Sequence, residues 1–220
     1  MDSPDLVARL ARLDTPAISD ALDAFGLSGI VVGLVPLTLP AKVAGRAVTV
    51  RLGPADGRPS SRHLGASAVM AAEPGDIIVI EHGRCDVAGW GGLLSRGARA
   101  RGVAAVVIDG AARDIDEARE LGLPLFGRTA VPVTARGRVM ETGFGAPIEI
   151  GGVAVEPGDL VIADGSGIAF LPAARAAEII ARAEEIAARE RLMAAEIDAG
   201  RPVGEVLGVG YEGMLRPSGG

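Results

Sequence analysis

The stretch of residues 89–128, GWGGLLSRGARARGVAAVVIDGAARDIDEARELGLPLFGR, constrains the fold of this chain more than any other. A glycine pair opens a short helical segment (residues 91–101), and an unbroken apolar strand follows (residues 103–108). The loop after that strand ends in the adjacent pair Arg113-Asp114. If the strands on both sides of the helix belong to one parallel sheet, the right-handed β-α-β rule brings the helix start and this loop to the same edge. The stretch therefore predicts a place for a ligand between them.

Charge and composition exclude several classes of protein. The formal net charge of −6 leaves no broad basic field of the kind that nucleic-acid binding needs. A single cysteine, Cys85, excludes an internal disulfide framework and a multi-cysteine metal site. The N-terminal segment has no signal-peptide core, and no apolar run reaches the roughly 20 residues of a membrane span. We expect a cytoplasmic protein with no nucleic-acid or membrane partner.

Helix and turn signals punctuate the rest of the chain. Thr15-Pro16 predicts a helix start with Thr15 as the N-cap. The tripeptide Pro-Gly-Asp occurs at residues 74–76 and again at 157–159, each time before an apolar run. Proline sets the first central position of a type II turn and glycine supplies the positive φ of the second, so each tripeptide predicts a turn that starts a strand.

The alternation of β-rich and α/β stretches predicts a compact layered α/β domain with a mixed sheet. We expect one domain over residues 1–220, with a core at about residues 10–172 and a C-terminal helix and tail at about residues 172–220.

The C-terminal helix is predicted from Pro172 to about residue 199, before Gly200. Its apolar positions recur at steps of four and three, but one of them is Glu190. A carboxylate on such a stripe either keeps its charged end in water beside a neighbouring side chain or meets a partner charge across an interface. Both interpretations stay open on the sequence.

The run Gly91-Gly92-Leu93-Leu94 offers free backbone N–H groups at a helix start, where glycines let a ligand approach the main chain. Such a place attracts a carboxylate or a phosphate. A glycine pair before a helix is also common without any ligand, so this signal is weak when taken alone.

Arg113-Asp114 carries more information together with that helix start. Arginine can bind a carboxylate through two hydrogen bonds, and the adjacent aspartate can ligate Mg²⁺ through oxygen. The alternative is that Asp114 caps a helix over residues 116–121 while Arg113 pairs with an acid. Spacing alone does not separate the two.

His63 is predicted in a helix that ends near Met70 and is capped by Ser60 or Ser61, after a loop rich in Gly, Pro and Ser. We interpret it as a surface or packing histidine.

Four segments together resemble the RraA-like family, over about residues 10–200. They are TPAISDALDAFGL, GWGGLLSRGARARGVAAVV, DGAARDIDEARELGLPLFGR and VEPGDLVIADGSGIAFLP. The family contains 4-hydroxy-4-methyl-2-oxoglutarate and 4-carboxy-4-hydroxy-2-oxoadipate aldolases, which are class II pyruvate aldolases. It also contains the regulator of ribonuclease activity A.

The resemblance implies a swivelling β/β/α domain, assembled as trimers or hexamers with active sites between subunits. By resemblance, Arg113 binds pyruvate, Asp114 ligates Mg²⁺ or Mn²⁺, and the amides of Leu93 and Leu94 hold the pyruvate carboxylate. Glu190 is the position that a neighbouring subunit would contribute. The implied reaction is C–C cleavage of a small 2-oxo acid through a pyruvate enolate, including oxaloacetate decarboxylation.

One position departs from the aldolase pattern. The aldolase members carry an acid 21 residues before the arginine, and here that position is Gly92. Glu81 and Asp86 lie upstream as candidate replacements. Three hypotheses follow: a metal-dependent lyase of this kind, a non-catalytic regulator on the same scaffold, or a related metal-dependent lyase with a different substrate.

Overall fold

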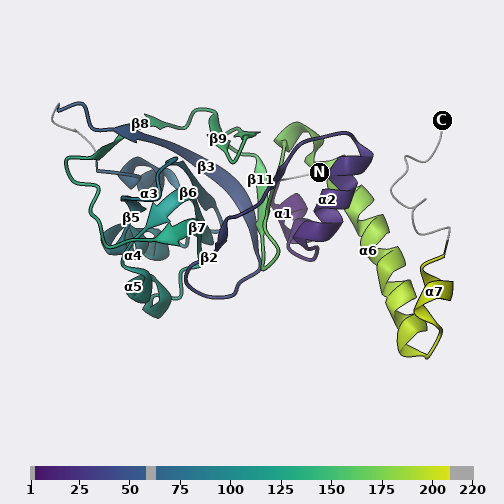
Figure 1. Ribbon diagram of the computed structural model, residues 1–220. Coiled ribbons are helices and arrows are strands. Elements are labelled where there is room, and N and C mark those ends of the chain that lie inside the picture. Colours follow the sequence, from purple (N-terminus) through teal and green to yellow (C-terminus); the bar gives the residue numbers. More distant parts are fainter. Residues whose placement is uncertain (1–2, 58–62, 209–220) are drawn as a thin grey trace.

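The computed structural model describes residues 3–57 and 63–208 of the chain (Figure 1). Ten of the described strands form one mixed sheet in the order β1-β12-β11-β3-β4-β6-β7-β2, with β5 paired to β6 and β8 paired to β3. The remaining described strands, β9 and β10, form a separate antiparallel pair. The strands are β1 (Ile30–Val31), β2 (Val35–Pro36), β3 (Val43–Pro54), β4 (Ile77–Glu81), β5 (Ala88–Trp90), β6 (Ala105–Ala112), β7 (Leu125–Ala130), β8 (Val139–Phe144), β9 (Ile148–Ile150), β10 (Val153–Val155), β11 (Leu160–Ala163) and β12 (Ile168–Leu171).

Helices flank this sheet at two ends of the molecule (Figure 1). They are α1 (Ser3–Leu10), α2 (Thr15–Ala24), α3 (Ala66–Ala71), α4 (Gly92–Ala100), α5 (Ile115–Glu120), the 3-10 turn η1 (Ala173–Arg175), α6 (Ala176–Asp198) and α7 (Val203–Val206). Helices α3, α4 and α5 lie at one end, whereas α1, α2 and α6 lie at the other (Figure 1). The expected α/β class, with a mixed sheet, flanking helices and a long C-terminal helix, is confirmed.

The parallel part of the sheet places the candidate site. Strands β3, β4, β6 and β7 are parallel neighbours, and β5 pairs with the far end of β6. Strands β4 and β6 carry runs of buried Ile and Val, the composition that parallel strands covered on both faces require. Because β5 and β6 are parallel, the chain that follows each of them emerges at the same edge. The predicted β-α-β unit is confirmed, with its second strand extended to Ala112.

The N-terminal helices are anchored differently from the prediction. Asp14, not Thr15, is the N-cap of α2, and its side chain accepts a hydrogen bond from Ala17 N. Thr15 is the first helical residue, and its N–H and Oγ1–H both donate to the carboxylate of Asp164, at 2.8 and 2.7 Å. The prediction of Thr15 as the cap was wrong because an acid precedes it and because its hydroxyl bonds to a residue far away in the sequence.

The two Pro-Gly-Asp turns are confirmed. Gly75 and Gly158 have φ values of 90° and 89°, as the third residue of a type II turn requires, and β4 and β11 follow. In each turn the aspartate side chain, Asp76 or Asp159, also accepts a hydrogen bond from the backbone N–H three residues earlier.

Helix α3 is shorter than predicted. It begins at Ala66, so His63 precedes the helix instead of lying in it; Ser60 and Ser61 fall outside the described residues. Gly65 takes the N-cap position with a positive φ and no side-chain cap.

Helix α6 ends where predicted, with Ala199 as its C-cap and Gly200 at a φ of 92°. Its first half packs on α2 through buried residues such as Ile179, Ala183 and Ile186, and its second half projects from the body (Figure 1). No helix within residues 3–57 and 63–208 is long and apolar enough to cross a membrane.

Candidate active site

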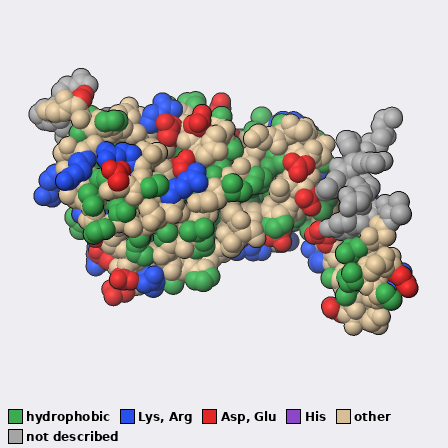
Figure 2. Space-filling model, in the orientation of Figure 1, with side chains coloured by type: hydrophobic (Ala, Val, Ile, Leu, Met, Phe, Trp, Pro, Cys, Tyr) green, Lys and Arg blue, Asp and Glu red, His purple; other side chains and the backbone are tan. Residues whose placement is uncertain are grey.

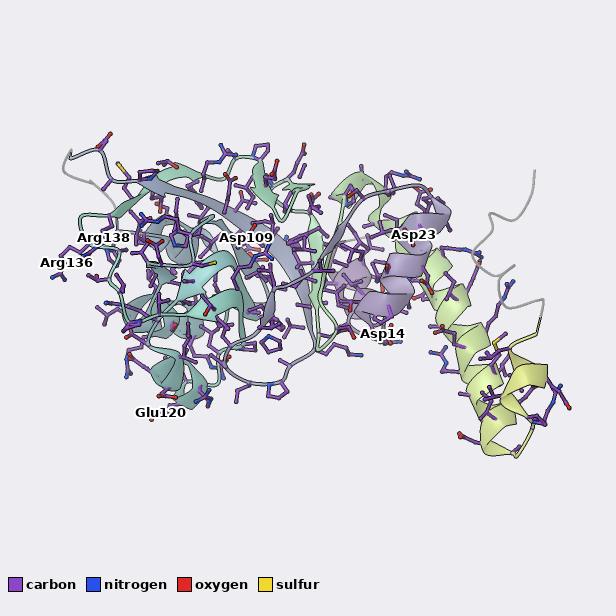
Figure 3. All side chains as sticks on the ribbon, viewed as in Figure 1. Asp14, Asp23, Asp109, Glu120, Arg136 and Arg138 are labelled. Carbon is purple, nitrogen blue, oxygen red and sulfur yellow. The ribbon has the colours of Figure 1, made fainter. Side chains whose placement is uncertain are left out.

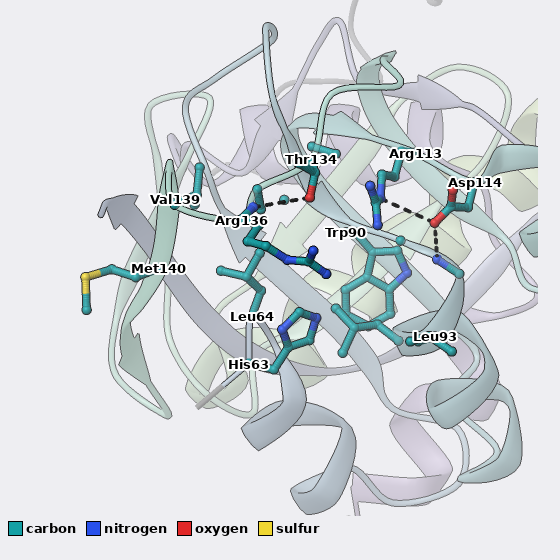
Figure 4. A pocket seen from close by; sticks show the side chains of 17 residues that line it. His63, Leu64, Trp90, Leu93, Arg113, Asp114, Thr134, Arg136, Val139 and Met140 are labelled. Carbon is teal, nitrogen blue, oxygen red and sulfur yellow. Dashed lines mark hydrogen bonds and ion pairs between the residues drawn. The ribbon is translucent and has the colours of Figure 1, made fainter. Parts of the chain in front are cut away.

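A cavity of about 340 Å³ opens at the edge of the sheet where β5 and β6 end (Figure 4). Its walls come from the β5–α4 junction, the β6–α5 junction, the segment of residues 134–140 before and within β8, and the residues just before α3. The lining residues are His63, Leu64, Ala88, Gly89, Trp90, Gly91, Gly92, Leu93, Leu94, Arg113, Asp114, Thr134, Ala135, Arg136, Gly137, Val139 and Met140. All the substrate-binding and metal-binding candidates of the central stretch therefore lie in one cavity.

The start of α4 presents backbone N–H groups to this cavity. Gly91 is the N-cap, with extended backbone, and Gly92 is the first helical residue. The N–H of Gly92 donates to Asp114 Oδ2 at 2.8 Å. Within the described chain, the N–H groups of Leu93 and Leu94 donate to no backbone or side-chain acceptor, so they are available to an anion at the positive end of the helix.

Asp114 has an uncommon backbone conformation. Its φ of 57° makes it the one non-glycine residue with positive φ among the residues described. It occupies the N-cap position of α5 but makes no side-chain cap there, so the interpretation of Asp114 as a cap for α5 was wrong. Its carboxylate instead reaches the start of α4. Backbone strain of this kind persists where surrounding contacts hold it, and it is concentrated at functional sites.

Arg113 lies beside this carboxylate, with Nε 3.4 Å from Asp114 Oδ2. The arginine therefore does pair with an acid, as one sequence interpretation had it, and that acid is its own neighbour. Both side chains remain about two-fifths exposed toward the cavity, at 38% and 40%. The pair can consequently meet a ligand from the open side.

A second arginine, which the sequence analysis did not single out, enters the cavity from the opposite wall. Arg136 reaches in from the segment before β8, while Arg113 enters from the end of β6 (Figure 4). Among the described residues no acid pairs with Arg136. Figure 2 shows Lys and Arg side chains gathered at this end of the molecule, where Figure 3 labels Arg136 and Arg138. The cavity thus holds two guanidinium groups against one carboxylate, which suits an anionic ligand.

The donor set fits a weakly held hard cation. In the described part of the chain there is no group of three or more His, Cys, Asp or Glu side chains that would enclose a metal ion. Asp114 offers Oδ1, which accepts no hydrogen bond from a described residue, and Oδ2 beside Gly92 N. Mg²⁺ commonly binds through one or two carboxylates and keeps several waters, so Asp114 suits this ion and not a structural Zn²⁺.

Glu81 and Asp86, the candidate replacements for the acid missing at position 92, do not reach the site. Glu81 is paired with Arg51 and accepts from Glu149 N, and Asp86 is paired with Arg84. Neither lines the cavity.

The carboxylate nearest to the missing side chain comes from a residue that the sequence analysis did not single out. A Cβ added to Gly92 would lie 1.8 Å from Glu117 Oε2. Glu117 lies one turn into α5, 25 positions along the chain, so nothing in the local sequence pattern pointed to it.

Glu190 belongs to α6, which lies at the end of the molecule away from α4 and α5 (Figure 1), and it does not line the cavity. It is half-buried, and burial raises the pKa of its carboxyl, with further increases from the charges of Asp20 and Asp14. The acidic residues Asp14 and Asp23 lie at the end of the body opposite Arg136 (Figure 3). The structure therefore does not bring Glu190 to the site of its own chain.

Comparison with known proteins agrees with this architecture. The model of the RraA-like family, described as Aldolase/RraA, matches residues 15–170. A protein of Halalkalibacterium halodurans named "Putative 4-hydroxy-4-methyl-2-oxoglutarate aldolase" is 32% identical over an alignment of 222 positions, which covers 97% of each chain. Protein DlpA of Legionella pneumophila is 29% identical over 198 residues, 90% of this chain, and the chain spans about a third (32%) of its length.

Among solved structures, Streptomyces coelicolor RraAS2 superposes with a TM-score of 0.81 at 28% identity, covering 87% of this chain and 98% of that one. Its structure is described as that of an unusual member of the RNase ES inhibitor RraA protein family. The matched family model spans the β-α-β unit, the Arg113-Asp114 pair and both Pro-Gly-Asp turns. The chain therefore belongs to the RraA-like family.

Proposed function

We propose that this protein is a divalent-metal-dependent lyase that cleaves a C–C bond of a small 2-oxo acid through a pyruvate enolate. The observation that carries the proposal is the meeting of Arg113, Asp114 and the free amides of Leu93 and Leu94 in one cavity. The candidate substrates are a 4-hydroxy-4-methyl-2-oxoglutarate-type aldol and oxaloacetate. The name of the Halalkalibacterium halodurans relative, which matches along nearly its whole length, supports the first of them.

The proposed binding mode uses the two charged features of the cavity. The amides of Leu93 and Leu94, at the positive end of α4, receive the carboxylate of the 2-oxo acid. Arg113 donates to the 2-oxo oxygen, where negative charge develops as the bond breaks. Asp114 would hold a divalent ion, which would supply Lewis acidity to the reacting 2-oxo acid.

Both candidate reactions place the same demand on these residues. In aldol cleavage the C3–C4 electron pair passes to the enolate while the 4-hydroxyl loses its proton; in decarboxylation the same bond breaks and CO₂ leaves. Either way the enolate is protonated at C3 to give pyruvate. Arg113 stabilises the charge that is present only during the reaction, which is what raises kcat.

The test is pyruvate release from each substrate in the presence of Mg²⁺ or Mn²⁺. Arg113→Ala removes a donor to the developing charge, and Asp114→Ala removes the proposed metal ligand; each is expected to lower kcat/KM at least about 100-fold. Asp116→Ala is the matched control, because Asp116 lies two residues away, is 90% exposed and pairs only with Arg119 among the residues described. Pyruvate release that survives both site substitutions would disprove the assignment.

A second candidate function is a non-catalytic regulator on the same scaffold. The relative described as a member of an RNase ES inhibitor family and the glycine at position 92 favour it. A ribonuclease inhibition assay with purified protein separates the two functions. Inhibition that persists in Asp114→Ala, with no lyase activity in the wild type, would establish the regulator.

We further propose a homotrimer or hexamer in which α6 of one subunit carries Glu190 to the site of another. The acidic face around Asp14, Asp20 and Glu190 and the basic end around Arg136 and Arg138 are complementary in charge, which supports such an arrangement (Figures 2 and 3). Light scattering after size exclusion measures the assembly. A monomer at assay concentration with full lyase activity would refute this arrangement.

A further inference from the structure

The side chain of Glu117 occupies the space beside Gly92. The backbone of Gly92 is helical and not left-handed, so φ does not require glycine there. A Cβ at this position would meet Glu117 Oε2 at 1.8 Å, Glu117 Cδ at 2.6 Å and Asp114 Cβ at 3.3 Å. The carboxylate of Glu117 thus occupies the room that a side chain at position 92 would take.

One contact holds this carboxylate between α4 and α5. Glu117 is the third residue of α5, and its Oε1 accepts from Arg96 Nε on α4 at 2.5 Å. The side chain is 32% exposed. Within the described residues Oε2 receives no hydrogen bond, so one oxygen is held and the other is free.

The free oxygen lies close to the candidate metal ligand. Gly92 N donates to Asp114 Oδ2 at 2.8 Å, and Glu117 Oε2 lies against the same glycine. These contacts leave Oδ2 and Oε2 at most about 7 Å apart, given standard backbone dimensions. Both oxygens are therefore within reach of one ion held by Asp114 and the water around it.

A cation held by a single carboxylate depends on the groups around it. Mg²⁺ and Mn²⁺ keep much of their hydration water, and the hydrogen-bond acceptors near that water orient it and tighten binding. Glu117, like Glu81 and Asp86, does not line the cavity itself. Of the described acids it is, however, the one that lies beside both Gly92 and Asp114, whereas Glu81 and Asp86 are engaged elsewhere.

We propose that Glu117 is a positioning residue of the metal site, which accepts hydrogen bonds from the water around an ion held by Asp114. The inference rests on the proposed function, because it requires a divalent ion at Asp114. A carboxylate placed at position 92 would enter the same space as the carboxylate of Glu117.

The first test measures Mn²⁺ affinity by electron paramagnetic resonance and calorimetry, without substrate. Glu117→Gln keeps the size of the side chain and removes its charge, and it is expected to weaken Mn²⁺ binding about 10- to 100-fold. Glu120→Gln is the matched control, because Glu120 is exposed at the far end of the same helix (Figure 3) and is expected to bind as the wild type does.

The second test moves the carboxylate. Gly92→Asp/Glu117→Ala places an acid on the other side of the same space and is expected to restore Mn²⁺ affinity to within about threefold of the wild type. A merely structural role for Glu117 in its pairing with Arg96 would not be rescued from position 92, because the double variant lacks that pair.

The outcomes separate this inference from the proposed function. Equal Mn²⁺ affinities for Glu117→Gln and Glu120→Gln overturn the role of Glu117, even if Asp114→Ala abolishes binding. Failure of a folded double variant to recover affinity also overturns it. Wild-type protein that binds no Mn²⁺, or binds it equally well after Asp114→Ala, overturns the metal site and the inference together.

Discussion

His82, directly after β4, is a buried histidine whose protonation is expected to weaken the fold. Its side chain packs behind the site, where its Cδ2 lies 3.0 and 2.6 Å from the positions that a Cβ would take on Gly89 and Gly110. Nε2 lies 2.8 Å from the carbonyl oxygen of Val87, so this nitrogen carries the proton. Nδ1 is buried without a hydrogen-bond partner among the described residues. A proton added to Nδ1 would therefore have no hydrogen-bond acceptor among the described residues.

The sign of the pH effect follows from this burial. Burial lowers the pKa of His82 and the charge of Arg84 lowers it further, while the bond to Val87 and the charges of Asp86 and Asp109 act in the opposite direction without prevailing. As pH falls below about 6.5, the unfolded chain binds a proton at this histidine before the native protein does. The free energy of unfolding therefore decreases, by at most about 1.4 kcal/mol per pH unit. Because the unfolded chain is only half protonated at pH 6.5, the loss between pH 6.5 and 5.5 is at most about 1 kcal/mol. For a chain of this size that corresponds to at most about 2–4 °C in Tm.

The assay is urea unfolding of wild type and His82→Gln at pH 7.5, 6.5 and 5.5. Glutamine can donate to Val87 O but does not titrate, so the difference between the two proteins isolates His82. Comparison with the variant is needed because two carboxyl groups act in the opposite direction. Burial raises the pKa of Asp20 and of Glu190, so their protonation at lower pH stabilises the native state and offsets the loss of stability that His82 causes. The wild type is expected to lose stability relative to the variant as pH falls. Parallel stability curves from pH 7.5 to 5.5 would refute the reasoning.

Three further predictions follow from single contacts. Asp164→Asn replaces the charged acceptor of both the Thr15 N–H and hydroxyl, and it is expected to lower the free energy of unfolding by about 2–3 kcal/mol. In calorimetry this corresponds to a fall in Tm of about 4–10 °C. An unchanged Tm would contradict the prediction. Gly65→Ala forces alanine into positive φ with its Cβ 3.1 Å from the Trp90 ring. The free energy of unfolding, measured by chemical denaturation, is expected to fall by about 1–2 kcal/mol. A stabilised variant would show that the strain is absent. Arg136→Gln removes an exposed cation of the cavity and is expected to raise KM for the proposed 2-oxo acids about tenfold with Tm unchanged; equal KM values would exclude Arg136 from binding.

Local signals in the sequence were sufficient for much of the architecture. Apolar runs and glycine or proline punctuation predicted the parallel unit around α4, the two Pro-Gly-Asp turns and the end of α6. Such signals act between residues that are close along the chain, so a pattern of sequence reports them directly. The pairing of two adjacent strands also placed Arg113 and Asp114 beside the start of α4.

Long-range contacts decided what the patterns left open. Thr15 is a good N-cap residue by type, but its hydroxyl bonds to Asp164, 149 positions away, and Asp14 caps the helix instead. Arg136 enters the cavity from a segment that carried no strong motif, because that wall forms only when β8 pairs with β3. The bond from Thr15 to Asp164 and the cavity wall that carries Arg136 both depend on contacts between residues far apart in the sequence.

The stretch of residues 89–128 shows most clearly what the sequence and the tertiary structure each determine. The sequence by itself determined that a glycine stands at position 92 and that Arg113 and Asp114 follow the next strand. Only the tertiary structure decided that Asp114 bonds to the start of α4 instead of capping α5, and that the carboxylate of Glu117 fills the space beside Gly92. The physical reason is that a side chain's partners depend on how α4 and α5 pack across the sheet edge, and the period of a helix or strand does not encode that packing.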